Sequence, residues 1–479
     1  MRLTRRQFLA SSGAALASAA WRPATPRREP PPNLLLIVSD DQALEDLGCS
    51  GNATIGTPSL DQIAAGGVRF TQAFTPTSVC QPSRGCLHTG LYGTSSGATE
   101  FTPIKPGIPT LSTVLKEAGY RTGLVGKTHL DPISQFRFDF LKTSDELGNG
   151  RDVEGIRDAT RWFIKKCKEA KQPFFLNVNF DDPHFPWPLT KGEAEPLMVQ
   201  WKKDHHGISP VNRALGDVAG LHPPDKVRLP GLFPDLPAIR QELARYCDAI
   251  TRLDRGVGYL LRVLDKLEVA DRTVILFVSD NGIEFPFHKR TPWEGGVHLP
   301  MIARWPGVTP PGSTCDGMVS FVDVMPTLLE IAGAKPPPYL EGRSFRAALE
   351  KPETPLRDEI VLAIMTVNGN DDTMSRGLRT TRFKYIRNAW GPRANFMIKA
   401  MEHETWAAVR EAAKGNEELA ERVDRYLHRP PFELYDLQAD PLEKRNLADD
   451  PDHADVRREL HERLRAAMAA IRDPFLELH

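Results

Sequence analysis

The sequence predicts an α/β protein in which a mainly parallel sheet lies between helices, followed by a small α+β subdomain. Two observations predict the main fold. Continuous apolar runs alternate with amphipathic helical patterns up to about residue 355, and this alternation is typical of a parallel sheet covered on both faces. A further observation, which predicts the subdomain, is a change of pattern after that point, where short alternating segments and a charged helix replace the apolar runs.

Four apolar runs predict the central strands. "NLLLIVSDD" (33–41), "PFFLNVNFDDPH" (173–184) and "RTVILFVSDNG" (272–282) are mainly apolar before they end in polar residues. Such runs indicate strands that are buried on both faces. "YRTGLVGKTHL" (120–130) predicts a shorter strand that leads into a loop.

Helical spacing of apolar residues predicts the covering layers. The segments are "SLDQIAAGG" (59–67), "PTLSTVLKEAG" (109–119), "RDATRWFIKKCKEA" (157–170) and a long pattern over 238–267 with a break near Gly256. Glycine closes the first two, as is common at helix ends.

The C-terminal part has a different character. Residues 376–388 alternate like an exposed strand, 432–448 predict a short strand with a turn, and 453–471 predict a charged amphipathic helix. We therefore expect a main α/β domain over 31–355 and a C-terminal subdomain with a small antiparallel sheet over 356–479. No internal repeat is evident.

The first 30 residues predict an export signal and a linker. Arg5 and Arg6 precede Phe8 and Leu9, and an Ala-rich run with small residues follows. This pattern is typical of the twin-arginine pathway, so the export machinery is an expected partner and the protein is expected to be periplasmic or secreted. A disordered basic tail is the alternative interpretation. The apolar run is too short to span a membrane, and no other run reaches its length.

Composition excludes several classes of partner. Hydrophobic residues make up 41% of the chain, charged residues 26%, and the net charge is −1. These values are ordinary for a globular protein and indicate neither a nucleic acid nor an anionic membrane surface as a partner. The six cysteines are unevenly spaced, match no zinc pattern and need not form disulfides, since twin-arginine substrates fold before export.

Residues with carboxylate, amide, ammonium or imidazole side chains follow the four predicted strands. Because the carboxyl ends of parallel strands meet at one edge of a sheet, we expect these residues to form one site. Each alone is more ordinarily a turn, N-cap or solvated residue, but together they complement one another. They are Asp40–Asp41, Lys127–His129, Asp181–His184 and Asp280–Asn281.

These residue types indicate a charged active site. Carboxylate and amide oxygens suit a hard cation, Ca²⁺ or Mg²⁺, better than zinc. Arg84, Lys127 and Lys289 would surround an anionic group with positive charge, and His129 and His184 could move protons near neutral pH.

The segment "CQPSRGCLHTG" (80–90) resembles the signature of the formylglycine-dependent sulfatases, with cysteine, proline and arginine at the family's spacing. The resemblance covers nearly the whole chain. It includes "LLLIVSDD", "GYRTGLVGKTHL", "DDPHFPW", "SDNGIEFPFHKRTPWEGGVHLP", "GLRTTRFKYIRN" and "FELYDLQADPLEKRNLA". Within the family, "SDNGIEFPF", "RFDF" and "DRGVGYLL" are most similar to the heparan N-sulfatases (sulfamidases).

This resemblance implies an alkaline-phosphatase-like sulfatase fold and a modified nucleophile. Cys80 would be oxidised to formylglycine (3-oxoalanine) by a formylglycine-generating enzyme. The implied cation, Ca²⁺ or alternatively Mg²⁺, would be bound by Asp40, Asp41, the modified Cys80, Asp280 and Asn281.

The resemblance also implies a role for each basic residue. The hydrated aldehyde would attack sulfur, and Arg84 would lower the cost of its alkoxide-like form. Lys127 and Lys289 would neutralise the sulfuryl oxygens. His184, with Lys289, would protonate the leaving group, and His129 would take the proton whose loss expels sulfate.

Two residues depart from the family pattern: Gln81 stands where a small residue is usual, and His88 where an apolar one is usual. Lys289 is preferred over Arg290 because its spacing to Trp293 matches the family.

The implied substrate is a sulfated sugar, with N-sulfated glucosamine as the favoured target. The loops expected to hold it contain Trp187, which would stack on the sugar or pack in the core, His205–His206 and Phe287–Trp293. The alternatives are an O-sulfate-specific glycan sulfatase, a phosphonate monoester or phosphodiester hydrolase, and a non-catalytic glycan-binding relative in which Cys80 stays a thiol.

Overall fold

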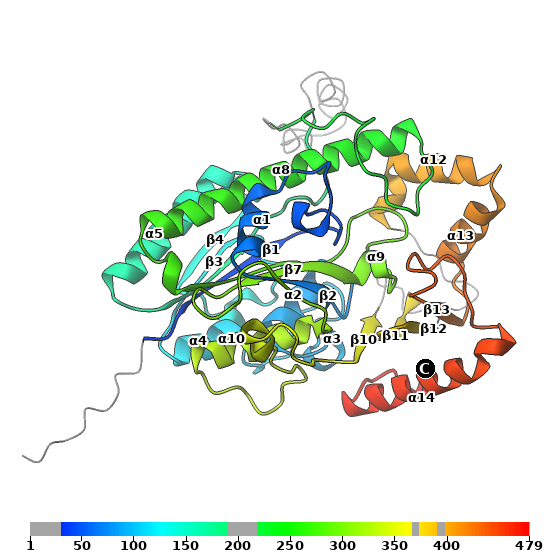
Figure 1. Ribbon diagram of the computed structural model, residues 1–479. Helices are drawn as coiled ribbons and strands as arrows, with labels where there is room; N and C mark the ends of the chain where they lie inside the picture. Colours follow the sequence, from blue (N-terminus) through cyan, green and yellow to red (C-terminus); the bar gives the residue numbers. More distant parts are fainter. Residues whose placement is uncertain (1–29, 190–217, 366–372, 390–397, 479) are drawn as a thin grey trace, which may run out of the picture. The chain divides into compact units, whose positions relative to one another are not determined.

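A nine-stranded sheet between layers of helices forms the centre of the structure (Figure 1). This computed structural model describes residues 30–189, 218–365, 373–389 and 398–478, and the chain from Pro32 onward belongs to one unit. The predicted export signal and the His205–His206 segment lie outside the described residues.

The sheet is mostly parallel, as the sequence predicts. β1 pairs in parallel with β5 and β6, and β3 pairs in parallel with β4 and β5, whereas β7 is antiparallel to β6 and β2. The order is β4 (Phe140–Thr143), β3 (Arg121–Gly126), β5 (Phe174–Asn179), β1 (Asn33–Ser39), β6 (Thr273–Ser279), β7 (His298–Arg304), β2 (Val68–Phe74) and β8 (Ser313–Cys315), with β9 (Val319–Ser320) also on β2.

Both faces of the sheet are covered. Along β1, Leu34, Leu36 and Val38 belong to one hydrophobic cluster, and Leu35 and Ile37 belong to another on the opposite face. This alternation follows from the period of two in a strand. It explains why the segment is apolar throughout.

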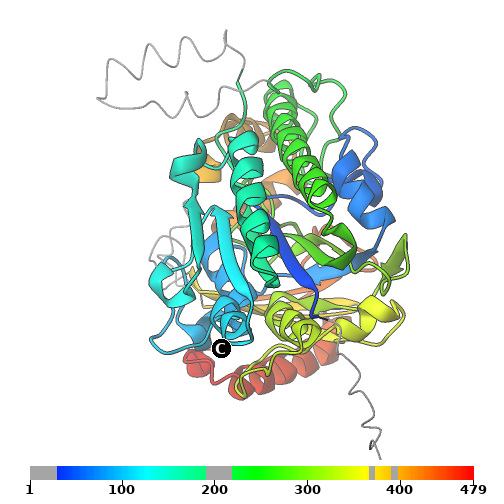
Figure 2. The same ribbon diagram turned by 90° about the vertical axis from the view of Figure 1, so that its left-hand side faces the viewer.

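Different helices bury the two faces (Figures 1 and 2). The residues of α1 (Pro58–Ala65), α5 (Val153–Glu169) and α8 (Pro237–Lys266) pack on one face. Those of α2 (Cys80–Thr89), α4 (Leu111–Glu117) and α10 (Val324–Ala332) pack on the other.

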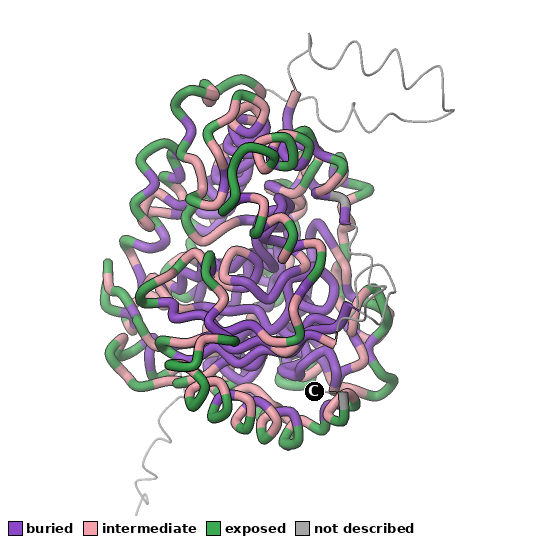
Figure 3. Tube along the Cα trace, turned by 90° about the vertical axis from the view of Figure 1, so that its right-hand side faces the viewer, coloured by how far each residue is buried: buried purple, intermediate pink, exposed green. Residues whose placement is uncertain are grey.

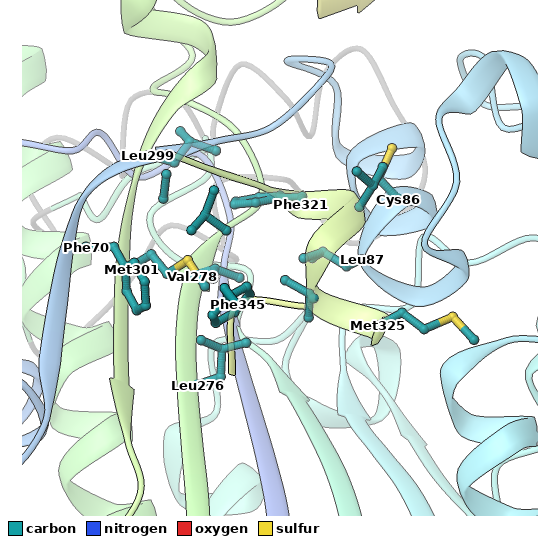
Figure 4. Close-up of a cluster of buried hydrophobic side chains, with 14 of the residues drawn as sticks. Phe70, Cys86, Leu87, Leu276, Val278, Leu299, Met301, Phe321, Met325 and Phe345 are labelled. Atoms are coloured by element: carbon teal, nitrogen blue, oxygen red, sulfur yellow. The ribbon is translucent and has the colours of Figure 1, made fainter. Parts of the chain in front are cut away.

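Figure 4 shows part of the cluster that contains Leu34, Leu36 and Val38. Its members include Leu276 and Val278 of β6, Leu87 of α2 and Met325 of α10. All four side chains are almost fully buried. Each contributes roughly 1.5–3 kcal/mol on leaving water. Cys86 and Leu87 therefore anchor the helix that begins at Cys80 in this cluster.

The long pattern over 238–267 forms one uninterrupted helix, α8, so the break predicted near Gly256 is wrong. A Cβ atom at Gly256 would lie 2.5 Å from Cε1 of Phe180. The glycine is explained by close packing between α8 and the segment that follows β5, and not by a turn.

The C-terminal part contains a four-stranded antiparallel sheet in the order β10 (Glu359–Ile364), β11 (Ser375–Thr380), β12 (Phe383–Asn388) and β13 (Phe432–Asp436). Helix α14 (Ala454–Ala470) packs against it through Leu460 and Leu464. The remaining described α-helices are α3 (Gly93–Ser96), α9 (Glu294–Val297), α11 (Arg346–Glu350), α12 (Glu404–Ala413) and α13 (Glu417–Leu427).

The prediction of one exposed strand over 376–388 is wrong. The segment forms the hairpin of β11 and β12, and every residue of β11 is buried. Its polar residues are paired inside the protein: Arg376 Nε donates to Asp473 Oδ2 at 2.6 Å with neither side chain exposed. A polar residue with a buried partner gives the same sequence pattern as a solvated one.

Figure 3 shows the buried core of the unit, with exposed segments at its surface. Among the described residues, no helix has both the length and the apolar character needed to cross a bilayer. All six cysteines lie in the described part, and none forms a disulfide.

Candidate active site

The polar ends of four adjacent strands meet at one edge of the sheet. Ser39 is level with Ser279 across β1 and β6, Val38 with Asn179 across β1 and β5, and Gly126 with Asn179 across β3 and β5. The segments that follow these strands are those selected from the sequence. The parallel register therefore brings them together.

Cys80 is the first residue of α2 and is 2% exposed. A helix can begin here because Pro82 occupies the first turn, where a missing N–H costs no helical hydrogen bond. The Sγ atom of Cys80 lies 3.4 Å from Asp40 Oδ1 and 3.9 Å from Asp41 Oδ1. Burial and the neighbouring Asp40 raise the pKa of the Cys80 thiol well above its usual value.

Arg84 lies one turn along α2 and contacts the end of β6. Its Nε atom donates to Asp280 Oδ2 at 2.8 Å, and its Nη2 atom lies 3.8 Å from Asp40 Oδ2. Neither Nη1 nor Nη2 has a hydrogen-bond acceptor among the described residues. These donors are buried and suit an anionic oxygen.

Lys127 follows β3 and pairs with Asp40. Burial alone would raise the pKa of Asp40, but Lys127, His184 and Arg84 outweigh it and hold that pKa well below its usual value. Gly126 makes the approach to β5 possible: its φ is +99°, and a Cβ atom would lie 1.8 Å from the Asn179 carbonyl oxygen.

Asp41 is at the centre of a second set of contacts. Lys289 Nζ lies 2.7 Å from its Oδ2, and Asn281 Nδ2 lies 2.5 Å from its Oδ1. The backbone of Asp41 is left-handed (φ +65°), and Asp280 Oδ1 and the Tyr246 hydroxyl bind its N–H and carbonyl at 3.2 Å each. Strain of this kind persists where surrounding contacts hold it, typically at functional sites.

His184 faces the carboxylates of Asp41 and Glu284, with its Nε2 atom 3.7 Å and 3.6 Å from their oxygens. Its Nδ1 atom lies 2.5 Å from the Phe185 carbonyl oxygen. Burial, together with Lys289 and Lys127, lowers the pKa of His184 to about 3.

Glu284 was missed in the sequence analysis. It is buried, and its Oε2 lies 3.9 Å from Lys289 Nζ as well as near His184. The available signal was an acidic residue three positions after Asn281 in an otherwise apolar stretch.

His129 lies on the Lys127 side of the site. Burial and Lys127 lower its pKa far below the usual value. Its Nδ1 atom has no hydrogen-bond partner among the described residues. The ring of Phe101 meets the His129 ring edge to face at 5.7 Å.

The geometry fits a hard cation. Ligand atoms of Asp40, Asp41, Cys80 and His184 all lie within 4.8 Å of one another. Asn281 Oδ1 is buried and lacks a hydrogen-bond partner in the described part of the chain, which leaves an acceptor for a cation. Burial and the neighbouring carboxylates raise the pKa of Asp41, although Lys289 opposes the shift, as expected for buried carboxylates crowded together.

Trp187 packs in the core. It is 3% exposed, and its Nε1 atom donates to the Pro183 carbonyl at 2.9 Å. Of the two roles left open for it, stacking on a sugar is therefore excluded. A cavity of about 370 Å³ lined by residues such as Tyr246, Trp293 and Arg379 does not include Cys80 or the aspartates around it.

Comparison with known families shows the family of the chain. The family described as "Sulfatase" matches residues 32–334, which is more than half of the chain. The chain is a member of the sulfatase family. It is therefore a sulfatase-family hydrolase, and its mostly parallel sheet with a small antiparallel C-terminal sheet is the sulfatase fold.

A second family, "N-sulphoglucosamine sulphohydrolase, C-terminal", matches residues 283–399 of this sulfatase. Human N-sulphoglucosamine sulphohydrolase is 30% identical over 94% of this chain and 92% of its own length. An ulvan-active sulfatase from Formosa agariphila is 28% identical over 90% and 78%. The solved structure of BT4656 in complex with its substrate D-glucosamine-2-N,6-O-disulfate is similar in fold, with a TM-score of 0.71, 21% identity, and coverage of 92% of this chain and 98% of that one.

Proposed function

We propose that this sulfatase removes sulfate from a sulfated sugar after Cys80 has been oxidised to formylglycine, and that N-sulfated glucosamine is its preferred target. One observation supports the proposal above the others. The Cys80 side chain begins helix α2 beside Asp40, and Arg84, Lys127 and Lys289 all contact the same aspartate pair.

Fixed positive charge suits an anionic substrate. Arg84 offers two nitrogens without acceptors among the described residues, and the ammonium groups of Lys127 and Lys289 are buried beside it. Preorganised charges of this kind stabilise the charge that develops on the sulfuryl oxygens. The N-terminus of α2 adds its positive dipole end at position 80.

A divalent cation would supply Lewis-acid chemistry at the nucleophilic oxygen of residue 80. We assign Ca²⁺, with Mg²⁺ as the alternative, because the candidate ligands are mainly oxygen donors. The proposed ligands are Asp40, Asp41, the modified Cys80, Asp280 and Asn281.

We assign proton transfer to Lys289 and His184 on one side of the site and to His129 on the other. Lys289 keeps its proton at neutral pH, since Asp41 and Cys80 raise its pKa despite burial. With His184 it faces the side on which we place the leaving group, and it supplies the proton that a departing amine needs. His129, on the Lys127 side, accepts the proton that residue 80 loses.

The choice of N-sulfated glucosamine is supported by the human relative and by the C-terminal family match, both of which are described as N-sulphoglucosamine sulphohydrolase. The experiment has two parts. The tryptic peptide with residue 80 should be lighter than its thiol form and should react with a hydrazide. The modified enzyme should then cleave N-sulfated glucosamine faster than 6-O-sulfated glucosamine. Preference for the O-sulfate would favour an O-sulfate-specific sulfatase, and preference for phosphonate monoesters would favour the phosphonate hydrolase alternative.

A further inference from the structure

Two phenylalanines are conspicuously exposed in the described part of the chain. Phe101 is 50% exposed and Phe185 is 40% exposed, and no other described phenylalanine is as exposed as either. Single exposed apolar residues are ordinary on protein surfaces. These two differ because each lies beside one of the two histidines of the active site.

Phe101 meets the ring of His129 edge to face, with centroids 5.7 Å apart. Its loop is tied to the active site from two directions. Gln81 Nε2 donates to the Thr102 carbonyl at 2.8 Å, and Arg290 Nη1 donates to Glu100 Oε1 at 3.0 Å.

These two hydrogen bonds give a role to Gln81 and Arg290, which the proposed reaction does not use. Gln81 follows Cys80 directly, and Arg290 follows Lys289. The Arg290 guanidinium also lies over the Phe101 ring, 5.9 Å from its centroid. The exposed ring is thus held at a fixed place relative to the nucleophile and to the Lys289 ammonium.

Phe185 follows His184, and its carbonyl accepts from the His184 ring. Its own ring packs against His403, with centroids 4.6 Å apart, and meets Trp187 edge to face at 5.3 Å. The contact with the buried Trp187 restrains the Phe185 ring. The exposed surface of this ring therefore has a fixed position as well.

We propose that Phe101 and Phe185 hold the sugar ring of the substrate, and that Gln81 and Arg290 position Phe101 for this task. The proposal rests on the proposed function, since it names how the sugar of that substrate is bound. A sulfuryl group that reaches residue 80 leaves its sugar at the level of the two histidines. A pyranose has an apolar C–H face, which an aromatic surface can cover while its hydroxyls stay in water.

The test separates sugar binding from sulfate binding. In Phe101→Ala and Phe185→Ala, we expect KM for N-sulfated glucosamine to rise about tenfold, the effect of losing much of one ring's apolar contact. The inhibition constant of inorganic sulfate, which has no ring, should not change. Phe101→Tyr, which keeps the ring, should leave KM at the wild-type value. Gln81→Ala should raise KM and leave the inhibition constant of sulfate unchanged.

Trp162→Ala is the matched control, because Trp162 is 48% exposed on α5 and should leave both constants unchanged. Melting temperatures within a few degrees of wild type would show that the variants are folded. An unchanged KM in both phenylalanine variants, or an equal weakening of sulfate inhibition, would overturn this inference and leave the proposed function standing. If the wild-type enzyme cleaves no sulfated pyranose, the proposed function fails and this inference falls with it.

Discussion

The Nε atom of Arg84 donates a hydrogen bond to Oδ2 of Asp280 at 2.8 Å, and both side chains are almost completely buried. The bond joins the helix that begins at Cys80 to the end of β6. An arginine–aspartate pair is costly to break inside a protein, because the remaining partner is left as an uncompensated charge.

We therefore predict that Asp280→Ala destabilises the protein by about 3–5 kcal/mol and also lowers its metal content below one ion per chain, with loss of activity. Metal content is measured by atomic emission and stability by denaturant unfolding. Asp473→Ala breaks the equally buried pair with Arg376 and is the matched control. It should cost similar stability while metal stays stoichiometric. Full metal occupancy in Asp280→Ala would contradict the assigned ligand.

The predicted acid sensitivity of folding depends on His88. Burial lowers its pKa to about 4, although Asn177 Oδ1 lies 3.1 Å from its Nε2 atom. The folded pKa lies below the unfolded value of 6.5, so the unfolded chain takes up the proton first. The free energy of unfolding should thus fall as pH drops from about 6.5 to 4, by about 3 kcal/mol.

Chemical unfolding at a series of pH values checks this expectation, with His88→Gln as the comparison. Glutamine cannot titrate, so the difference in stability between the two proteins should shrink or reverse toward pH 4. Parallel pH profiles for the two proteins would show that His88 contributes nothing to acid sensitivity.

His184→Ala should distinguish leaving groups. A departing amine needs a proton more than an aryl oxide does, so we predict that sulfamate cleavage falls about 10²–10⁴-fold, whereas cleavage of an activated aryl sulfate falls much less. His129→Ala should slow both substrates alike, because its assigned proton comes from residue 80. Equal losses on both substrates in His184→Ala would contradict the assignment of His184 to the leaving group.

Gly256→Ala should destabilise the protein, although alanine favours helix. Its Cβ atom would overlap the Phe180 ring, and overpacking of a core costs about 1–3 kcal/mol. Gly415→Ala, where a Cβ atom meets nothing within 4 Å, is the control and should be neutral or nearly so. Thermal unfolding of the two variants decides the matter. A stabilised Gly256→Ala protein would contradict the packing argument.

Export remains a proposal from the sequence. Replacing both Arg5 and Arg6 by lysine should keep the precursor in the cytoplasm, because the twin-arginine receptor recognises the pair. Cell fractionation with an antibody to the protein measures this. Arrival of the double variant in the periplasm would refute the assigned pathway.

Much of the fold was predictable because strands buried on both faces leave a plain signal. "NLLLIVS" and "TVILFVS" became the adjacent strands β1 and β6. The sequence could not distinguish a helix glycine at a close contact from one at a break, as at Gly256. Nor could it distinguish paired buried arginines from solvated ones, as at Arg376. Both errors concern partners distant in sequence.

The candidate site was predictable for a similar reason: parallel pairing places the ends of strands together whatever the side chains do. Contacts that depend on loop paths were not predictable. Glu284 approaches His184 from the loop after β6, although the two residues are far apart in the sequence. Trp187 is buried, and the exposed aromatic residue beside His184 is Phe185.

The burial of Cys80 has a consequence for the biosynthesis of the enzyme. With 2% of its surface exposed, the thiol is inaccessible to a modifying enzyme once the chain has folded. The proposed oxidation of Cys80 therefore has to precede folding. A molecule that folds with its thiol intact is then expected to keep it, so the formylglycine content of a preparation would report the relative rates of oxidation and folding.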